Sequence, residues 1–395
     1  MRPPARKSTG PTRRRGAVMP ILCVLLTTLL GFVALTYDIG RTAVVRGQLQ
    51  NAADAAALAA ASSLGTDNLL IPNGSQSIDM TNAKLQAQKF AQANSYDLNG
   101  SKSIVLTPAT DVSVGILTAP TDLTQSMAGS GSTAFNSVKV TAFVDALHGG
   151  RLNFLFAPIL GQTSTAVSAS ATATVQLYTL STVKALSGQN SPILPITMSL
   201  SDWRQMVNKQ TGKDNFTYNP TTNTIIPGPD GIYEQQLYPG SNVSSSNNGL
   251  IQFGTNSRSN AVLRGQVVNG TTYDQMVAEW PPSGSPPWNA NRQFTIDADP
   301  GWRATTFTDL STVAASGLPR LIPINDGTPP GNGANGGYTI VALAPVRVVY
   351  AQSGGKSSGY AMVQPAVITD PTVVASQTTL SITGQGGVPV VRLTR

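Results

Sequence analysis

The chain has 395 residues, which is enough for two or three domains of ordinary size. Only 11% of the residues are charged, against about 25% in an average soluble domain. The net charge is +7, but residues 1–15 supply six basic residues and no acid, so the rest is close to neutral. A nucleic-acid-binding protein needs a basic surface on its folded part, so this class is excluded. The abundance of small polar residues, glycine and proline favours a β-rich exported protein.

The sequence offers little for catalysis or metal binding. A single cysteine, Cys23, excludes an intramolecular disulfide framework and a cysteine-based zinc site. The one histidine, His148, precedes two glycines and is predicted to be a solvated residue at a loop edge. No nucleophile elbow is present. We therefore expect no catalytic residues, no metal site, no cofactor and no enzymatic activity.

An uncharged segment near the N-terminus predicts a membrane anchor. No charged residue occurs between Ala17 and Tyr37. About 20 apolar residues in a helix span a hydrocarbon layer of about 30 Å, and Tyr37 lies where an interfacial aromatic side chain belongs. Arginines flank the segment on one side, and Asp38 follows it on the other. The cluster before the segment consists of Arg13, Arg14 and Arg15. This charge asymmetry predicts a cytoplasmic stub over 1–16 and a transmembrane helix over 17–37.

A cleaved signal peptide is the alternative interpretation of this segment. Its apolar region would be only about 7–15 residues long. Here the apolar run is longer and continues into residues 38–64, which are rich in alanine, leucine and glutamine and favour a helix. We therefore predict a retained helix that continues as a stalk. Its small residues allow close backbone approach, so Ala53, Ala56 and Ala60 are expected to pack against the sheet of residues 103–180 or another chain.

The remaining pattern predicts an α+β protein. A pilin-like domain, a helix backed by an antiparallel sheet, is expected within 38–186, and a β-rich extracytoplasmic domain within 187–395. The first is predicted to contain a helix at 79–96 and strands at 104–106, 112–117, 138–144 and 164–180. The second is predicted to contain helices at 201–212 and 259–270 and strands at 338–343, 346–350, 360–363 and 380–383.

Two stretches of the N-terminal region carry a family resemblance. The runs LTYDIGR at 35–41 and QLQNAADAAALAAA at 48–61 resemble the N-terminal signature of TadG-like proteins of the tight-adherence (Flp) pilus-assembly systems of bacteria. The resemblance covers residues 13–65, and a second one, to TadE/TadG-type proteins, covers 111–175. Ile21 stands where a pilin precursor carries glutamate, five residues after Gly16, which argues against prepilin processing.

The resemblance implies a membrane-anchored envelope protein that acts in pilus assembly through protein–protein contacts. The implied partners are the lipid bilayer and other pilus-assembly or envelope proteins, with a second copy of this chain as a further candidate. The implied location is the bacterial cytoplasmic membrane, crossed once, with the bulk of the chain periplasmic or extracellular.

An anchored enzyme or carbohydrate-binding module with a pilus-like stalk is the alternative function. A pocket that collects Glu234, Asp274 and Glu279 would support it, because paired carboxylates cleave glycosidic bonds. Three tryptophans flank a proline-rich stretch and predict either an interaction loop or packing of the second domain; they are Trp280, Trp288 and Trp302.

Overall fold

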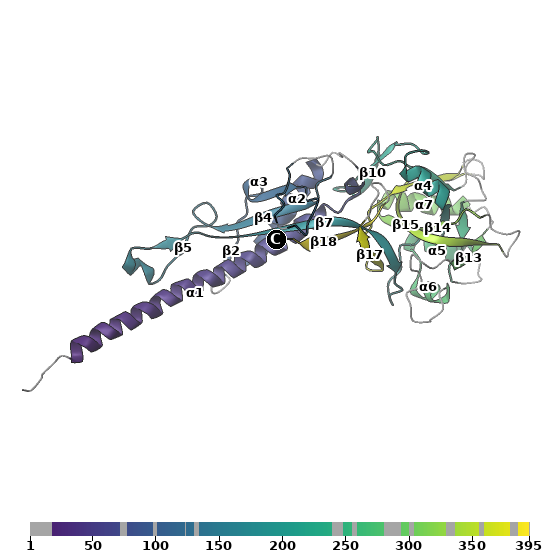
Figure 1. Cartoon of the computed structure of the whole chain (residues 1–395). Coiled ribbons are helices and arrows are strands. Elements are labelled where there is room, and N and C mark those ends of the chain that lie inside the picture. The colour runs from purple at the N-terminus through teal and green to yellow at the C-terminus, as the bar shows by residue number, and fades with distance from the viewer. Residues whose placement is uncertain are drawn as a thin grey trace, which may run out of the picture. The chain divides into compact units, whose positions relative to one another are not determined.

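The computed structural model confirms the α+β class (Figure 1). It describes residues 18–71, 77–97, 101–122, 124–129, 134–238, 248–254, 259–279, 294–299, 304–328, 336–354, 359–379 and 386–394. These residues form two compact units. Unit 1 is drawn from Met1–Ala52, Gln92–Leu106 and Ala142–Ala169, and unit 2 from Ala53–Ala91, Thr107–Thr141 and Ser170–Arg395. The domain boundaries predicted at residues 16, 37 and 186 remain predictions.

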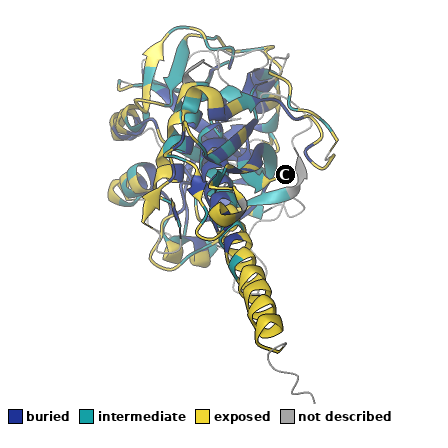
Figure 2. Ribbon diagram, turned by 90° about the vertical axis from the view of Figure 1, so that its left-hand side faces the viewer, coloured by how far each residue is buried: buried dark blue, intermediate teal, exposed yellow. Residues whose placement is uncertain are grey.

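Helix α1 runs without interruption over Val18–Ser63, 46 residues. Residues 18–33 of the helix are exposed all round, whereas one face of its C-terminal half is buried (Figure 2). The buried residues recur every three or four positions, which is the spacing of one helical face; they begin with Val45, Leu49, Ala52, Ala53 and Ala56, each fully buried. The apolar segment and the alanine-rich segment are therefore one continuous helix.

Unit 1 combines the first part of α1 with two small hairpins and a short 3-10 helix. The hairpin strands are β1 (Ser95–Tyr96) with β2 (Lys102–Ser103) and β5 (Leu152–Asn153) with β6 (Ser164–Thr165), and the 3-10 helix η2 spans Ala157–Leu160. The helix predicted over 79–96 ends earlier, at Gln92. Asp97 has φ 87°, outside the helical region, and follows strand β1 instead.

The first antiparallel sheet has five strands, with β7 pairing β4, β17 and β18 and β4 pairing β3. The strands are β3 (Val112–Gly115), β4 (Ser137–Val144), β7 (Val167–Val183), β17 (Val373–Thr379) and β18 (Val388–Leu393). The predicted strand at 104–106 does not form. The adjoining helices are η1 (Asp67–Leu70), α2 (Ser77–Gln92) and α3 (Pro108–Asp111).

The second sheet belongs wholly to unit 2 and has seven strands in the order β11-β16-β15-β13-β12-β8-β14. Because β14 also pairs with β15, the pairing path from β15 to β14 closes on itself. The strands are β8 (Ile196–Ser199), β11 (Gln235–Tyr238), β12 (Gly249–Ile251), β13 (Phe294–Asp299), β14 (Pro319–Asn325), β15 (Gly337–Gln352) and β16 (Tyr360–Pro365). A separate hairpin pairs β9 (Phe216–Asn219) with β10 (Thr224–Pro227).

Two apolar clusters of buried residues cover the two faces of the seven-stranded sheet. Neighbouring residues such as Leu321 and Ile322 fall in different clusters, as expected where side chains alternate along a strand. One cluster contains residues of α4, α5 and α7 and the other contains Met276 of α6; these helices are α4 (Leu200–Val207), α5 (Asn260–Asn269), α6 (Tyr273–Glu279) and α7 (Ala304–Ser316).

The helix ends and late strands differ in detail from the predictions. The helix predicted over 201–212 is shorter: α4 begins at Leu200, is capped by the Ser199 hydroxyl, which accepts from the Asp202 amide, and ends at Val207. The helix predicted over 259–270 is confirmed as α5, in which Ser259 and Gly270 are the capping residues. The two strands predicted at 338–343 and 346–350 form one strand, β15. The strand predicted at 380–383 lies outside the described residues.

Candidate functional site at the end of the apolar segment

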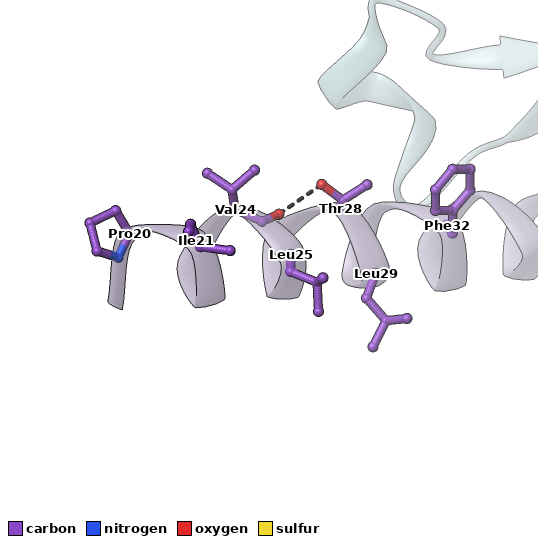
Figure 3. Close-up of a pocket in the computed structure, with 7 residues that line it drawn as sticks. All are labelled: Pro20, Ile21, Val24, Leu25, Thr28, Leu29 and Phe32. Carbon is purple, nitrogen blue, oxygen red and sulfur yellow. Dashed lines mark hydrogen bonds between the residues drawn. The ribbon is translucent and has the colours of Figure 1, made fainter. Parts of the chain in front are cut away.

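The apolar part of α1 is suited to a lipid environment. The helix is long and apolar enough to cross a membrane. Its threonine hydroxyls donate to carbonyl oxygens four residues earlier, Thr27 to Cys23 at 2.8 Å and Thr28 to Val24 at 2.7 Å. Polar groups in a bilayer must find such internal partners. A shallow apolar groove runs along one side of the helix (Figure 3), lined by Pro20, Ile21, Val24, Leu25, Thr28, Leu29 and Phe32. These features fit a single-pass anchor.

Asp38 follows this segment directly and holds a loop of unit 1. Its carboxylate accepts from the backbone amides of Leu155, Phe156 and Ala157, at 2.9, 2.9 and 2.7 Å. The side chain is buried, with 2% exposed. Burial raises the pKa of the Asp38 carboxyl, but the three amides and Arg41 outweigh it, so that the pKa lies below its ordinary value. Asp38 is therefore charged at neutral pH and ties the start of η2 to α1.

Arg41, one helical turn later, joins two further segments to the same helix. Its guanidinium donates to the Asp97 carboxylate at 2.9 Å and to the Asn153 carbonyl at 2.7 Å. Gln48 completes the contact, because its amide accepts from the Asp97 backbone N–H at 3.0 Å and donates to the Asp97 carbonyl at 3.1 Å. These bonds hold Asp97 in its left-handed conformation.

An aromatic contact lies beside this polar junction. The rings of Tyr37 and Phe156 meet edge to face, with centroids 5.8 Å apart. Together with Asp38, Arg41 and Gln48, Tyr37 makes the end of the apolar segment the place where unit 1 is attached to its helix. We call these four helix residues the junction. Tyr37 and Asp38 were predicted as flanks of the anchor, whereas the roles of Arg41 and Gln48 were not predicted from the sequence. Their spacing of three and ten residues from Asp38, which keeps them on its side of a helix, was the signal available.

His148 is not the solvated residue that the sequence predicted. It is buried, its Nδ1 lies 2.7 Å from the Asp145 carboxylate, and its ring stacks on Phe143 at 5.1 Å. The hydrogen bond from His148 lowers the pKa of the Asp145 carboxyl. The Asp145 side chain also accepts from the Leu147 and His148 amides, so the pair shapes a turn after β4. Within the described part of the chain, no group of three or more His, Cys, Asp or Glu side chains is arranged to hold a metal ion.

The carboxylates considered for carbohydrate chemistry each have a local structural partner or lie in solvent. Glu234 accepts from the amides of Asn215 and Phe216, and Glu279 accepts from the Gly254 amide. Burial raises the pKa of both carboxyls. Asp274 is exposed in the first turn of α6.

The other predicted residues divide into two groups. Ala53, Ala56 and Ala60 are fully buried, and their role in stalk packing remains a prediction. The arginine cluster and the three tryptophans lie outside the described residues; they are Arg13, Arg14, Arg15, Trp280, Trp288 and Trp302.

Comparison with known proteins agrees with the resemblance at this site. Residues 16–63 match the family model Tad, described as putative Flp pilus-assembly TadE/G-like. The match contains the whole junction and all of α1, and it confirms the family resemblance that the sequence predicted there. The resemblance over 111–175 lies outside it and remains a prediction. No curated protein and no solved structure matches the chain.

Proposed function

We propose that this chain is a single-pass, membrane-anchored envelope protein of a tight-adherence (Flp) pilus-assembly system, and that it acts through protein–protein contacts rather than catalysis. The observation that carries the proposal is the coincidence of the family match with the junction. The matched segment combines an anchor-like apolar helix with the residues that attach a folded unit to it. Because the family signature covers both the apolar helix and the junction, we infer that the family's shared feature is a folded domain held at a membrane surface.

The proposed topology follows from charge. Arg13, Arg14 and Arg15 precede the apolar segment, whereas Asp38 and Arg41 follow it and have partners in unit 1. By the positive-inside rule, the N-terminus lies in the cytoplasm and the chain after Tyr37 lies outside it. The proposed membrane is the bacterial cytoplasmic membrane.

The proposed partners are other pilus-assembly or envelope proteins, with a second copy of this chain as a candidate. Exposed loops carry binding residues more often than packed elements do. Residues 294–299, within the stretch from Trp280 to Trp302, form strand β13, which pairs with β12 and β15. We therefore retain only residues 280–293, which include Trp280 and Trp288, as the proposed interaction loop.

For the alternative, an anchored enzyme or carbohydrate-binding module, a pocket would have to collect Glu234, Asp274 and Glu279. Glu234 already accepts from two backbone amides and Glu279 from one, and Asp274 is exposed.

Deletion of the gene tests the proposal in the bacterium that encodes it. We expect loss of surface pili or adherence, restored by the wild-type chain. Two variants then separate the functional classes: deletion of residues 281–287 removes the proline-rich stretch, and His148→Ala removes the one histidine. Adherence that is lost with the deletion and kept with His148→Ala supports an assembly role. Adherence that tolerates the deletion but is abolished by His148→Ala, in a chain that still folds, would overturn it.

A further inference from the structure

The segment between β5 and β6 exposes apolar side chains in an unusual concentration. Residues 154–161, here called the apolar loop, have the sequence FLFAPILG and carry no charge. Ile159 is 85% exposed, Leu155 62% and Phe156 38%. Such a cluster marks a surface that meets another apolar phase, because exposing it to water is unfavourable.

The junction fixes where the apolar loop lies. Three consecutive amides of the loop bond to Asp38, the first residue after the uncharged segment, and Phe156 contacts the Tyr37 ring. The loop therefore meets α1 within one residue of the point at which an apolar helix leaves the hydrocarbon layer. Aromatic side chains such as Tyr37 and Phe156 are characteristic of that interface.

We propose that the apolar loop is a second membrane contact, which inserts Leu155 and Ile159 into the interfacial layer of the bilayer that α1 crosses. The proposal rests on α1 crossing a membrane, as proposed above. A bilayer is the favoured occupant because the Asp38 bonds hold the loop at the depth where α1 leaves the lipid. The exposed Arg151 directly precedes β5 and adds a positive charge for lipid phosphates. With both α1 and the apolar loop in contact with the bilayer, unit 1 is restricted in its rotation about α1 and in its tilt at the membrane surface.

Fluorescence of the reconstituted full chain tests this. In a Cys23→Ser background, Ile159→Cys carries an environment-sensitive nitrobenzoxadiazole label, and the protein is diluted into phosphatidylcholine–phosphatidylglycerol vesicles with a nitroxide on the acyl chain near the headgroup. Leu318→Cys, an exposed apolar position of unit 2 (52% exposed), is the control. The wild-type chain labelled at Cys23, an exposed cysteine of the apolar segment, reports the anchor itself.

We expect blue-shifted, nitroxide-quenched emission at position 159 and water-like, unquenched emission at position 318. In the Asp38→Asn variant, which places an amide where three donors need an acceptor, quenching at 159 should fall while quenching at Cys23 stays. Water-like emission at 159 with Cys23 quenched overturns the proposal and leaves the anchor intact. A blue shift at 159 without lipid quenching also overturns it and identifies a protein partner or second copy instead. Loss of quenching at Cys23 overturns the anchor and this proposal together.

Discussion

The ion pair between Asp67 and Arg347 connects the start of η1 to the middle of β15 inside unit 2. The Arg347 Nε lies 2.8 Å from one Asp67 oxygen, and the other oxygen accepts from the Val367 amide at 2.7 Å. Both side chains are almost fully buried, with 3% and 4% exposed. Arg347 also donates to the Gly317 carbonyl and lies 3.4 Å above the ring of Tyr218. Because water barely reaches either side chain, each charge is stabilised in large part by the opposite charge of its partner.

Removing one member of this pair should be strongly destabilising. Arg347→Met keeps much of the side-chain volume but leaves the Asp67 carboxylate buried without its partner, which costs about 3–5 kcal/mol of unfolding free energy. Chemical denaturation of the purified chain in detergent measures it. The double variant Asp67→Asn with Arg347→Met should recover part of the loss, because no unpaired charge then remains. A single variant as stable as the wild type would show that the pair is solvated in the native protein.

Asp230 gives unit 2 a stability that depends on pH. Burial, with the nearby carboxylates of Asp214 and Asp67, raises the pKa of its carboxyl to about 7. Because the folded value lies above the unfolded one, its contribution to stability is complete below about pH 4 and is lost as the pH rises through 7. Asp230→Asn should therefore stabilise unit 2 at pH 8 by up to about 4 kcal/mol and have little effect at pH 4.

Denaturation midpoints at pH 4, 6 and 8 check this prediction, with Asp326→Asn as the control because the Asp326 side chain is exposed. Equal pH profiles for the wild type and Asp230→Asn would mean that the Asp230 carboxyl titrates normally.

At the scale of elements, the buried face of α1 depends on small side chains. Ala56 is fully buried, whereas Asn51 is exposed on the same helix. Ala56→Trp adds volume to a packed site and should lower the unfolding free energy by about 1–3 kcal/mol or more. Asn51→Trp, the matched control, should change it little. Thermal unfolding in detergent, followed by pull-down of envelope partners, measures the effect. An Ala56→Trp chain with wild-type stability and wild-type assembly would exclude tight packing of this face.

The sequence predicted those elements whose signals are local. The uncharged run and the alanine-rich run following it predicted α1, and Ser259 with Gly270 predicted both ends of α5, because capping depends on a few adjacent residues. The helix predicted to reach Tyr96 was too long because Asp97 is held by Gln48, 49 residues earlier. No local pattern contains that bond.

Long-range pairing explains most of what the sequence did not predict. The pairing of β17 and β18 with β7 joins strands about 200 residues apart, and nothing in their composition specifies that partner. At the junction, Asp38 was predicted as an anchor flank from its place after the apolar run. Its three amide partners lie more than 100 residues away, so its structural role needed the folded chain.

At the scale of the whole molecule, the anchor predicts which parts of the chain face each side of the membrane. The arginines at 13–15 favour the cytoplasmic side. All of unit 2, and the part of unit 1 that comes after Tyr37, follow the apolar segment in sequence. Cysteine accessibility in bacteria that express the full chain tests this. In a Cys23→Ser background, Leu318→Cys should react with a membrane-impermeant maleimide in spheroplasts with an intact cytoplasmic membrane, because this side chain is exposed and predicted to lie outside the cytoplasm. Ser8→Cys in the basic stub should react only after the membrane is permeabilised. The opposite pattern, with Ser8→Cys labelled in intact spheroplasts and Leu318→Cys protected, would reverse the topology and place the junction on the cytoplasmic face.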